Sequence, residues 1–146
     1  MENINLKELK LEDYPSITFD KIRYGDTDRQ GHVNNAKFSS FSETGRSEIF
    51  HDPENPLAAP DCMFAIANFT VDYLAEVNWP GTVEIGTGFV KVGNSSLFIV
   101  QGIYQNNKLC TTVKTVLVHV TERPMKPVPL SEKSREILKK YMLEIK

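Results

Sequence analysis

The alternation of hydrophobic and polar residues along the chain predicts five strands. Between residues 63 and 77 every odd position is apolar, while polar residues such as Asn68 and Asp72 occupy even positions. This period of two is typical of a strand with one buried face. A shorter first strand is expected at residues 16–24, with its core-facing side chains at Ile17, Phe19 and Ile22. Three more strands are expected at residues 83–92, 96–104 and 109–120.

A long helix is predicted between the first two strands. Its apolar residues recur at intervals of three and four, which places them on one face: Phe38, Phe41, Gly45 and Ile49. Asn34 is a suitable N-cap, so the helix is expected to begin at Asn34 or Asn35. Gly45 costs a helix up to ~1 kcal/mol relative to alanine. Its place on the buried face therefore indicates a close approach by another backbone, as when a sheet wraps around a helix.

The order of these elements indicates an α+β fold with an antiparallel sheet. Consecutive long strands joined by tight turns, such as Asn106-Asn107, pair antiparallel. The hydrophobic pattern slips by one residue near Val90, beside Gly88, which predicts a β-bulge. A final helix is expected over about residues 131–144, capped by Ser131. Its apolar stripe comprises Ile137, Leu138, Tyr141, Met142 and Ile145.

The second face of the sheet also carries apolar residues, which indicates that something covers it. These residues include Phe98, Val100, Val116 and Val118. A helix and a short tail are expected to cover part of this face. The remainder, together with an edge strand that needs protection, favours oligomerisation.

Composition and charge narrow the function classes. The 146 residues predict one domain, 1–146, with its core at about residues 16–123. A net charge of −2 without a basic block argues against a nucleic-acid partner. No apolar run approaches the ~18 residues that a membrane span needs. We expect a cytoplasmic protein in which Cys62 and Cys110 serve as small apolar strand residues, with a disulfide as the less common alternative. Because the histidines are scattered, no metal site is expected.

The segment DTDRQGHVNN is the strongest candidate for chemistry. It leaves a strand, passes through a glycine-containing loop and enters the long helix. The first helical turn has free N–H groups that suit a developing oxyanion, and the carboxylate of Asp28 lies just upstream. A carboxylate and such a donor are the minimum needed to hydrolyse an activated acyl compound. The same residue types also occur in purely structural strand-to-helix loops, and by spacing alone that interpretation is the more common one.

A resemblance favours the catalytic interpretation. The run RYGDTDRQGHVNNAKF, with its D-x-D-x-x-G-H-V spacing, resembles the 4-hydroxybenzoyl-CoA thioesterase-like branch of the hotdog-fold superfamily. The stretches VGNSSLFI and LCTTVKTVLVHV are similar to the middle and final strands of that family, so the resemblance covers about residues 16–123. It implies a curled antiparallel sheet of five or six strands around a long central helix. The predicted C-terminal helix is not part of it.

The resemblance also implies roles for individual residues. Asp28, the second aspartate of DTD, corresponds to the catalytic carboxylate, and the backbone N–H of Asn35 to the donor that polarises the thioester carbonyl. Asp26 is expected to be structural. Glu43 is a second-choice base, with Arg46 as a possible ion-pair partner, and Arg46 is otherwise interpreted as a solvated charge. The residues expected to contact substrate are Gly31, His32, Asn34, Ser95 and Ser96.

The implied activity is hydrolysis of an acyl-CoA thioester to a free acid and CoA, with no cofactor or metal. The implied assembly is a homodimer or homotetramer with active sites between subunits. No nucleic acid or membrane is expected as a partner. Two alternatives stay open: hydrolysis of acyl groups carried by acyl carrier protein, and a non-catalytic module that binds acyl-CoA.

Overall fold

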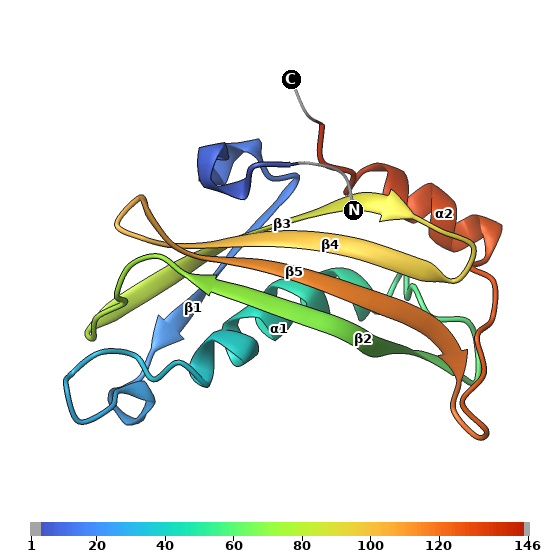
Figure 1. The fold of residues 1–146 in the computed structure, drawn as a ribbon. Helices are drawn as coiled ribbons and strands as arrows, with labels where there is room; N and C mark the ends of the chain where they lie inside the picture. Colours follow the sequence, from blue (N-terminus) through green and yellow to red (C-terminus); the bar gives the residue numbers. More distant parts are fainter. Residues whose placement is uncertain (1–3, 145–146) are drawn as a thin grey trace.

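A curled five-stranded antiparallel sheet lies over one long helix, α1, in this computed structural model, which describes residues 4–144 (Figure 1). The strand order is β1-β3-β4-β5-β2, so β1 and β2 are the two edges. The strands are β1 (Ser16–Ile22), β2 (Cys62–Tyr73), β3 (Gly81–Val92), β4 (Ser96–Gln105) and β5 (Lys108–Thr121). The helices are α1 (Lys37–Phe50) and α2 (Glu132–Lys139), with single 3₁₀ turns at Leu6–Glu8, Leu11–Asp13 and Tyr24–Asp26. The predicted class and order of elements are confirmed.

Two predicted details of the strands are confirmed. Asn106 and Asn107 form the β4–β5 turn with φ angles of 51° and 64°. Positive φ at both central residues matches the right-handed twist of the flanking strands, and asparagine tolerates it well. The register of β3 against β4 shifts between Phe89 and Lys91, which is the bulge predicted from the hydrophobic slip.

The predicted core face of β1 is wrong. Ile17 and Phe19 point away from the helix and are 50% and 67% exposed, and only Ile22 is buried as expected. The flank of α1 that faces β1 is polar, so hydrogen bonds rather than apolar contacts join the two elements. Their side-chain pairs are Thr18–Glu48 at 2.9 Å and Asp20–Thr44 at 3.0 Å.

The unbroken alternation predicted for residues 63–77 is also wrong. The strand ends at Tyr73, and its register against β5 shifts between Ile66 and Asn68. One inserted residue reverses the faces on either side of the bulge. Phe64, at an even position, therefore packs against the core before the bulge, whereas Phe69, at an odd position, does so after it.

The buried stripe of α1 is confirmed, and its glycine explains how closely the sheet approaches. Phe38, Phe41 and Ile49 are each at most 4% exposed. A Cβ atom at Gly45 would lie 2.7 Å from the side-chain nitrogen of Gln101 and 2.8 Å from the hydroxyl of Thr87. Because any side chain there would collide with the sheet, glycine permits β3 and β4 to wrap around the helix.

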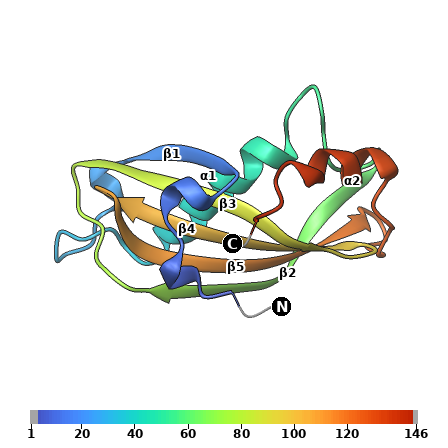
Figure 2. The ribbon, with the colours of Figure 1, turned by 90° about the horizontal axis from the view of Figure 1, so that it is seen from above.

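The N-terminal turns cross the outer face of the sheet (Figure 2). Tyr14 packs on a cross-strand pair of glycines, Gly86 and Gly102, where a side chain would collide with it or with Tyr104. Val100 is buried in the cluster that this segment forms. The other apolar residues predicted on this face are half-buried: Phe98, Val116 and Val118. Coverage by a short tail is therefore confirmed for part of the face.

The C-terminal helix is shorter than predicted. Ser131 caps it as expected, accepting a hydrogen bond from the Ser134 N–H at 3.1 Å, but α2 ends at Lys139. The chain then pairs with the bulge of β3, where the Phe89 N–H donates to Tyr141 and its carbonyl accepts from Leu143. Ile145 of the predicted stripe lies outside the described residues. Neither helix in residues 4–144 has the length and apolar character needed to cross a membrane.

Candidate functional site

The loop between β1 and α1 is held at both ends by backbone hydrogen bonds. Asp26 accepts the Arg23 N–H on its carboxylate at 2.8 Å and the Asn34 N–H on its carbonyl at 2.8 Å. The Val33 N–H donates to Val77, in the connection between β2 and β3. Asp26 therefore has the structural role expected of it, and the residues between 26 and 34 form a defined loop.

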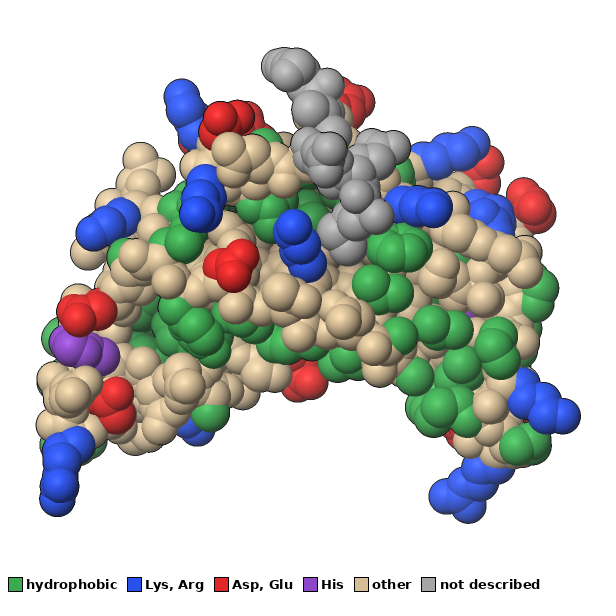
Figure 3. Space-filling view, in the orientation of Figure 1, with side chains coloured by type: hydrophobic (Ala, Val, Ile, Leu, Met, Phe, Trp, Pro, Cys, Tyr) green, Lys and Arg blue, Asp and Glu red, His purple; other side chains and the backbone are tan. Residues whose placement is uncertain are grey.

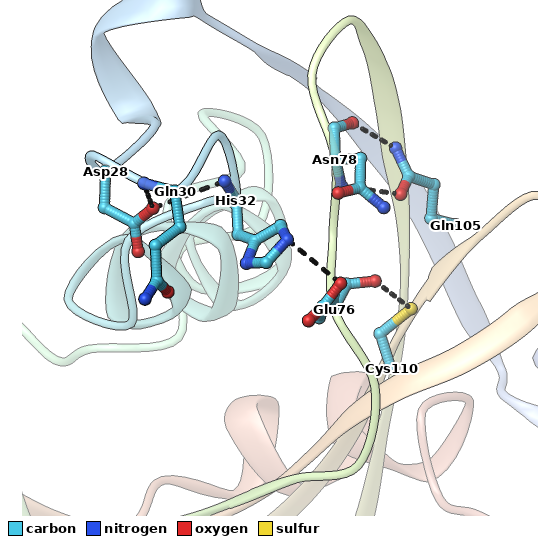
Figure 4. Close-up of polar contacts among 7 residues, drawn as sticks. All are labelled: Asp28, Gln30, His32, Glu76, Asn78, Gln105 and Cys110. Atoms are coloured by element: carbon cyan, nitrogen blue, oxygen red, sulfur yellow. Dashed lines mark hydrogen bonds and ion pairs between the residues drawn. The ribbon is translucent and has the colours of Figure 1, made fainter.

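One carboxylate oxygen of Asp28 accepts hydrogen bonds from this loop, and the other accepts none from residues 4–144. Oδ1 accepts the backbone N–H groups of Gln30 at 2.9 Å and His32 at 3.3 Å (Figure 4). Gly31 makes the turn with a φ of 84°, a conformation that glycine adopts without strain. Oδ2 has no hydrogen-bond partner among residues 4–144. The loop thus holds the carboxylate in place and leaves one oxygen free.

The entry into α1 leaves one backbone donor free. The helix begins at Lys37 rather than at Asn34 or Asn35, and Asn34 is not its N-cap. Asn34 instead closes the preceding turn, because its side chain accepts the Ala36 N–H at 3.0 Å and its carbonyl accepts the Lys37 N–H at 2.9 Å. Across positions 34–37, only the N–H of Asn35 has no acceptor among the described residues. The free donor is thus the N–H of Asn35, which is the donor that the resemblance implied.

Asp28 and Asn35 line the same hollow, beside the end of β2. Its volume is about 560 Å³, and its walls include Phe38 and Tyr73. The Tyr73 hydroxyl donates to the Asn35 carbonyl at 3.1 Å and so fixes the backbone of that residue. A free carboxylate oxygen and a free N–H therefore border one space with an apolar wall.

His32 reaches across the hollow to a residue that sequence reasoning missed. Its Nε2 lies 3.1 Å from a carboxylate oxygen of Glu76, whose own carbonyl lies 3.7 Å from the thiol of Cys110 (Figure 4). Gln105 makes two hydrogen bonds to the Asn78 backbone, at 2.7 and 2.9 Å, and so fixes the segment that carries Glu76. Glu76 is 44 residues from His32, and nothing in the local pattern signals the pairing.

The other expected substrate contacts are not gathered at the hollow. Gly31 and Asn34 shape the loop and the turn but do not line this space. Ser95 and Ser96 lie at the β3–β4 turn, and ten residues of β4 separate this turn from the end of the sheet near Asn78. At ~3.3 Å per residue that distance is about 30 Å. Within one chain, Ser95 and Ser96 therefore lie far from Asp28.

Glu43 and Arg46 also lie elsewhere, in a second cavity toward the far end of α1. They do not form an ion pair within 4 Å. Arg46 is only 7% exposed, so its interpretation as a solvated charge is wrong. Within residues 4–144, no group of three His, Cys, Asp or Glu side chains is placed to hold a metal ion.

Comparisons with known proteins show which family the chain resembles. Residues 22–138 match the family described as the thioesterase-like superfamily. A curated relative from Escherichia coli O6:H1, acyl-CoA thioester hydrolase YbgC, is 30% identical over 111 residues, which cover 73% of this chain and 83% of the relative. The residues matched by the family include the candidate loop and strands β2 to β5.

Solved structures share the fold. A thioesterase from Thermus thermophilus, crystallised with coenzyme A and zinc, is 29% identical, has a TM-score of 0.73, and aligns over 88% of this chain and 94% of its own. The PA5185 protein from Pseudomonas aeruginosa PAO1 has a TM-score of 0.84 at 23% identity, over 94% of this chain and 98% of its own. The hotdog architecture implied by the loop motif is therefore confirmed. The chain belongs to the thioesterase-like superfamily.

Proposed function

We propose that this protein hydrolyses acyl-CoA thioesters, with the carboxylate of Asp28 and the N–H of Asn35 as its catalytic groups. The observation that carries the proposal is the shared hollow, in which one oxygen of Asp28 and the N–H of Asn35 both lack a hydrogen-bond partner within residues 4–144. Relatives named as an acyl-CoA thioester hydrolase and as a thioesterase bound to coenzyme A support this substrate class.

The two groups suit the two demands of thioester hydrolysis. The Asn35 N–H donates to the carbonyl oxygen as it becomes an oxyanion. The free oxygen of Asp28 takes the proton of a water molecule, whose oxygen adds to the carbonyl carbon. The tetrahedral intermediate then breaks its C–S bond, and the CoA thiolate leaves and is protonated. Direct attack by Asp28 through a mixed anhydride uses the same placement.

The walls of the hollow suit an apolar acyl group near the thioester. Phe38 is buried and meets the ring of Tyr73 edge to face, with ring centres 5.4 Å apart. Tyr73 and Leu74 are 53% and 39% exposed, so the outer side of the hollow is open. An acyl group or a second protein chain can cover these apolar side chains.

We also infer that a second copy of the chain completes the site. The free edge of β2 is twelve residues long and carries exposed Ile66 and Tyr73, and an edge of this kind readily pairs with another strand. Antiparallel pairing of two β2 edges would bring the Cys62 end of one strand beside the Tyr73 end of the other. The turn with Ser95 and Ser96 lies at the Cys62 end, so one copy would place these serines near the other copy's Asp28.

A hydrolysis screen tests the proposed activity. The purified protein is offered a panel of short, long and aromatic acyl-CoAs, and free thiol release is followed. Hydrolysis of at least one class well above the uncatalysed rate is expected. Absence of turnover across the panel would contradict the proposal. Light scattering coupled to size exclusion tests the assembly: a dimer or tetramer is expected, and a monomer at all concentrations would refute completion by a second copy.

A further inference from the structure

A second cavity lies between the C-terminal half of α1 and the first half of β2. Its volume is about 390 Å³, within the range of ~300–1,000 Å³ that is typical of small-molecule sites. Its wall includes the apolar side chains of Phe50, Met63, Phe64 and Ile66, and the carboxylates of Glu43 and Glu122 also line it. Hydrophobic side chains also gather on the surface over this end of the sheet, where β2 begins and β5 ends (Figure 3). None of the residues that line it lines the hollow at Asp28.

One cation, Arg46, lines this cavity. Its side chain is 93% buried by area, yet its guanidinium makes no hydrogen bond or ion pair with any residue in 4–144. Nη1 is fully enclosed and lacks a partner. The guanidinium carbon lies 5.8 Å from the ring centre of Phe69, and burial lowers the pKa of the group, while nearby Glu43 opposes that shift. Glu43 itself is exposed, so water screens its charge.

A buried guanidinium without an acceptor is unfavourable unless something else supplies one. Removing a charged donor from water costs several kcal/mol when no partner replaces the lost hydration. The planar guanidinium fits a carboxylate with two parallel hydrogen bonds, which are stronger than bonds between neutral groups. A cavity with one such cation beside apolar side chains therefore matches a ligand with an apolar body and a single carboxylate.

We propose that this cavity binds an organic carboxylate, with the carboxylate on Arg46 and the apolar body against Phe50 and Phe64. The two rings meet edge to face, with centres 4.8 Å apart, and form a firm apolar wall. Glu43 and Glu122 at the cavity disfavour a second negative charge, so a monocarboxylate group is preferred to a phosphate.

Two kinds of ligand carry such a carboxylate on an apolar body. One is a free carboxylic acid, the class of product that thioester hydrolysis releases. The other is an acyl-CoA whose acyl chain ends in a second carboxylate. This second source rests on the proposed function. In the paired arrangement of β2 edges inferred above, the cavity of one copy lies beside the Asp28 end of the other, so an acyl chain could extend into it.

Calorimetric titration with octanoate and with its neutral analogue octanamide tests the binding site. Wild-type protein is expected to bind octanoate at least about tenfold more tightly than octanamide, because only the anion pairs with Arg46. Arg46→Met is expected to lose that preference. Lys91→Met is the matched control, because Lys91 also lies over an aromatic ring, Phe98, but on the exposed surface away from the cavity.

A second variant tests the cavity without changing the cation. Ala58 lines the cavity from the loop after α1, and Ala58→Trp should fill the space and weaken octanoate binding by about tenfold or more. Equal binding of octanoate and octanamide to the wild type, or unchanged octanoate binding in Arg46→Met, would overturn the proposal. Absence of saturable octanoate binding would also overturn the proposal. This outcome includes the case in which a second copy of the chain fills the cavity.

Hydrolysis assays then distinguish the sources. If the carboxylate is the end of an acyl chain, Arg46→Met lowers kcat/KM for suberoyl-CoA about tenfold relative to kcat/KM for octanoyl-CoA. If the ligand is a free acid, the ratio of the two kcat/KM values stays as in the wild type, while octanoate binding is still lost. A protein that hydrolyses no acyl-CoA but binds octanoate through Arg46 would refute the proposed function and retain this site.

Discussion

The two ends of α1 differ in whether the unpaired polar groups beside them are exposed or buried. At its beginning, Asp28 and Asn35 lie in an exposed loop and turn, and their unused oxygen and N–H border an open hollow. Toward its end, Arg46 is buried without an acceptor among residues 4–144, beside a cavity with several apolar side chains. Water can satisfy the free groups at the first end until a substrate displaces it. At the second end Nη1 of Arg46 is shut off from water, so this unmatched donor indicates a ligand more strongly than polarity alone would.

The largest effect on activity is expected from a substitution at Asp28, at the first end of α1. Asp28→Asn is expected to lower kcat on acyl-CoA about 10³-fold, because general-base assistance is typically worth ~10²–10⁴. Folding and acyl-CoA binding should change little, since the asparagine carbonyl can still accept the loop N–H groups. The measurement is thiol release at saturating substrate.

Asp52→Asn is the matched control for this change. Asp52 also accepts a backbone N–H of its own loop, from Glu54 at 3.0 Å, but it lies just after α1. This variant should retain wild-type kcat. Equal rates in Asp28→Asn and wild type would show that the carboxylate at the first end has no catalytic role.

A backbone change at Asn35 should have the next largest effect. Asn35→Pro removes the free N–H, and proline suits this position because Asn35 follows the first residue of the turn closed by the Lys37 N–H. We expect kcat to fall about 10²-fold, as for loss of one oxyanion donor. Asn35→Ala retains the N–H and should stay within about threefold of wild type. Similar rates in the two variants would contradict a backbone donor at this residue.

Between the two ends, Gly45 determines whether the sheet can close over α1 at all. Gly45→Ala places a methyl group 2.7–2.8 Å from Gln101, Ile85 and Thr87, so we expect the free energy of unfolding to fall by about 2 kcal/mol. Gly25→Ala is the control, because no atom lies within 4 Å of its added Cβ. Urea unfolding measures both variants. A stability for Gly45→Ala at or above that of Gly25→Ala would mean that the helix and sheet are less closely packed than described.

The smallest effect is expected on the free energy of unfolding, from a substitution of Arg46 at the second end of α1. Arg46→Met replaces an unpartnered buried cation with an apolar side chain, so the free energy of unfolding without ligand should stay constant or rise by about 1 kcal/mol. Thermal and urea unfolding of the ligand-free protein measure it. A loss of more than about 2 kcal/mol would indicate that the guanidinium already has a partner in the folded protein.

Local sequence patterns predicted many of the helices and strands, because the formation of these elements depends on neighbouring residues along the chain. The spacing of Phe38, Phe41, Gly45 and Ile49 was sufficient to predict the buried face of α1, and the slip near Val90 was sufficient to predict the bulge in β3. β1 was different, because its polar inward face depends on the polar flank of α1 that it meets. In β2, the bulge near Ala67 is set by pairing with β5, and the hydrophobic pattern of β2 alone did not reveal it.

The amino-acid sequence by itself determined the order of elements, the loop with Asp28 and Asn35, and the family that these residues indicate. Only the tertiary structure decided that Tyr73 anchors Asn35, that Glu76 meets His32, and that Arg46 is enclosed. Periodicity records which side of an element is apolar over a few residues. It does not record which distant element packs there, and that packing decides whether a polar group meets a partner, water or an empty cavity.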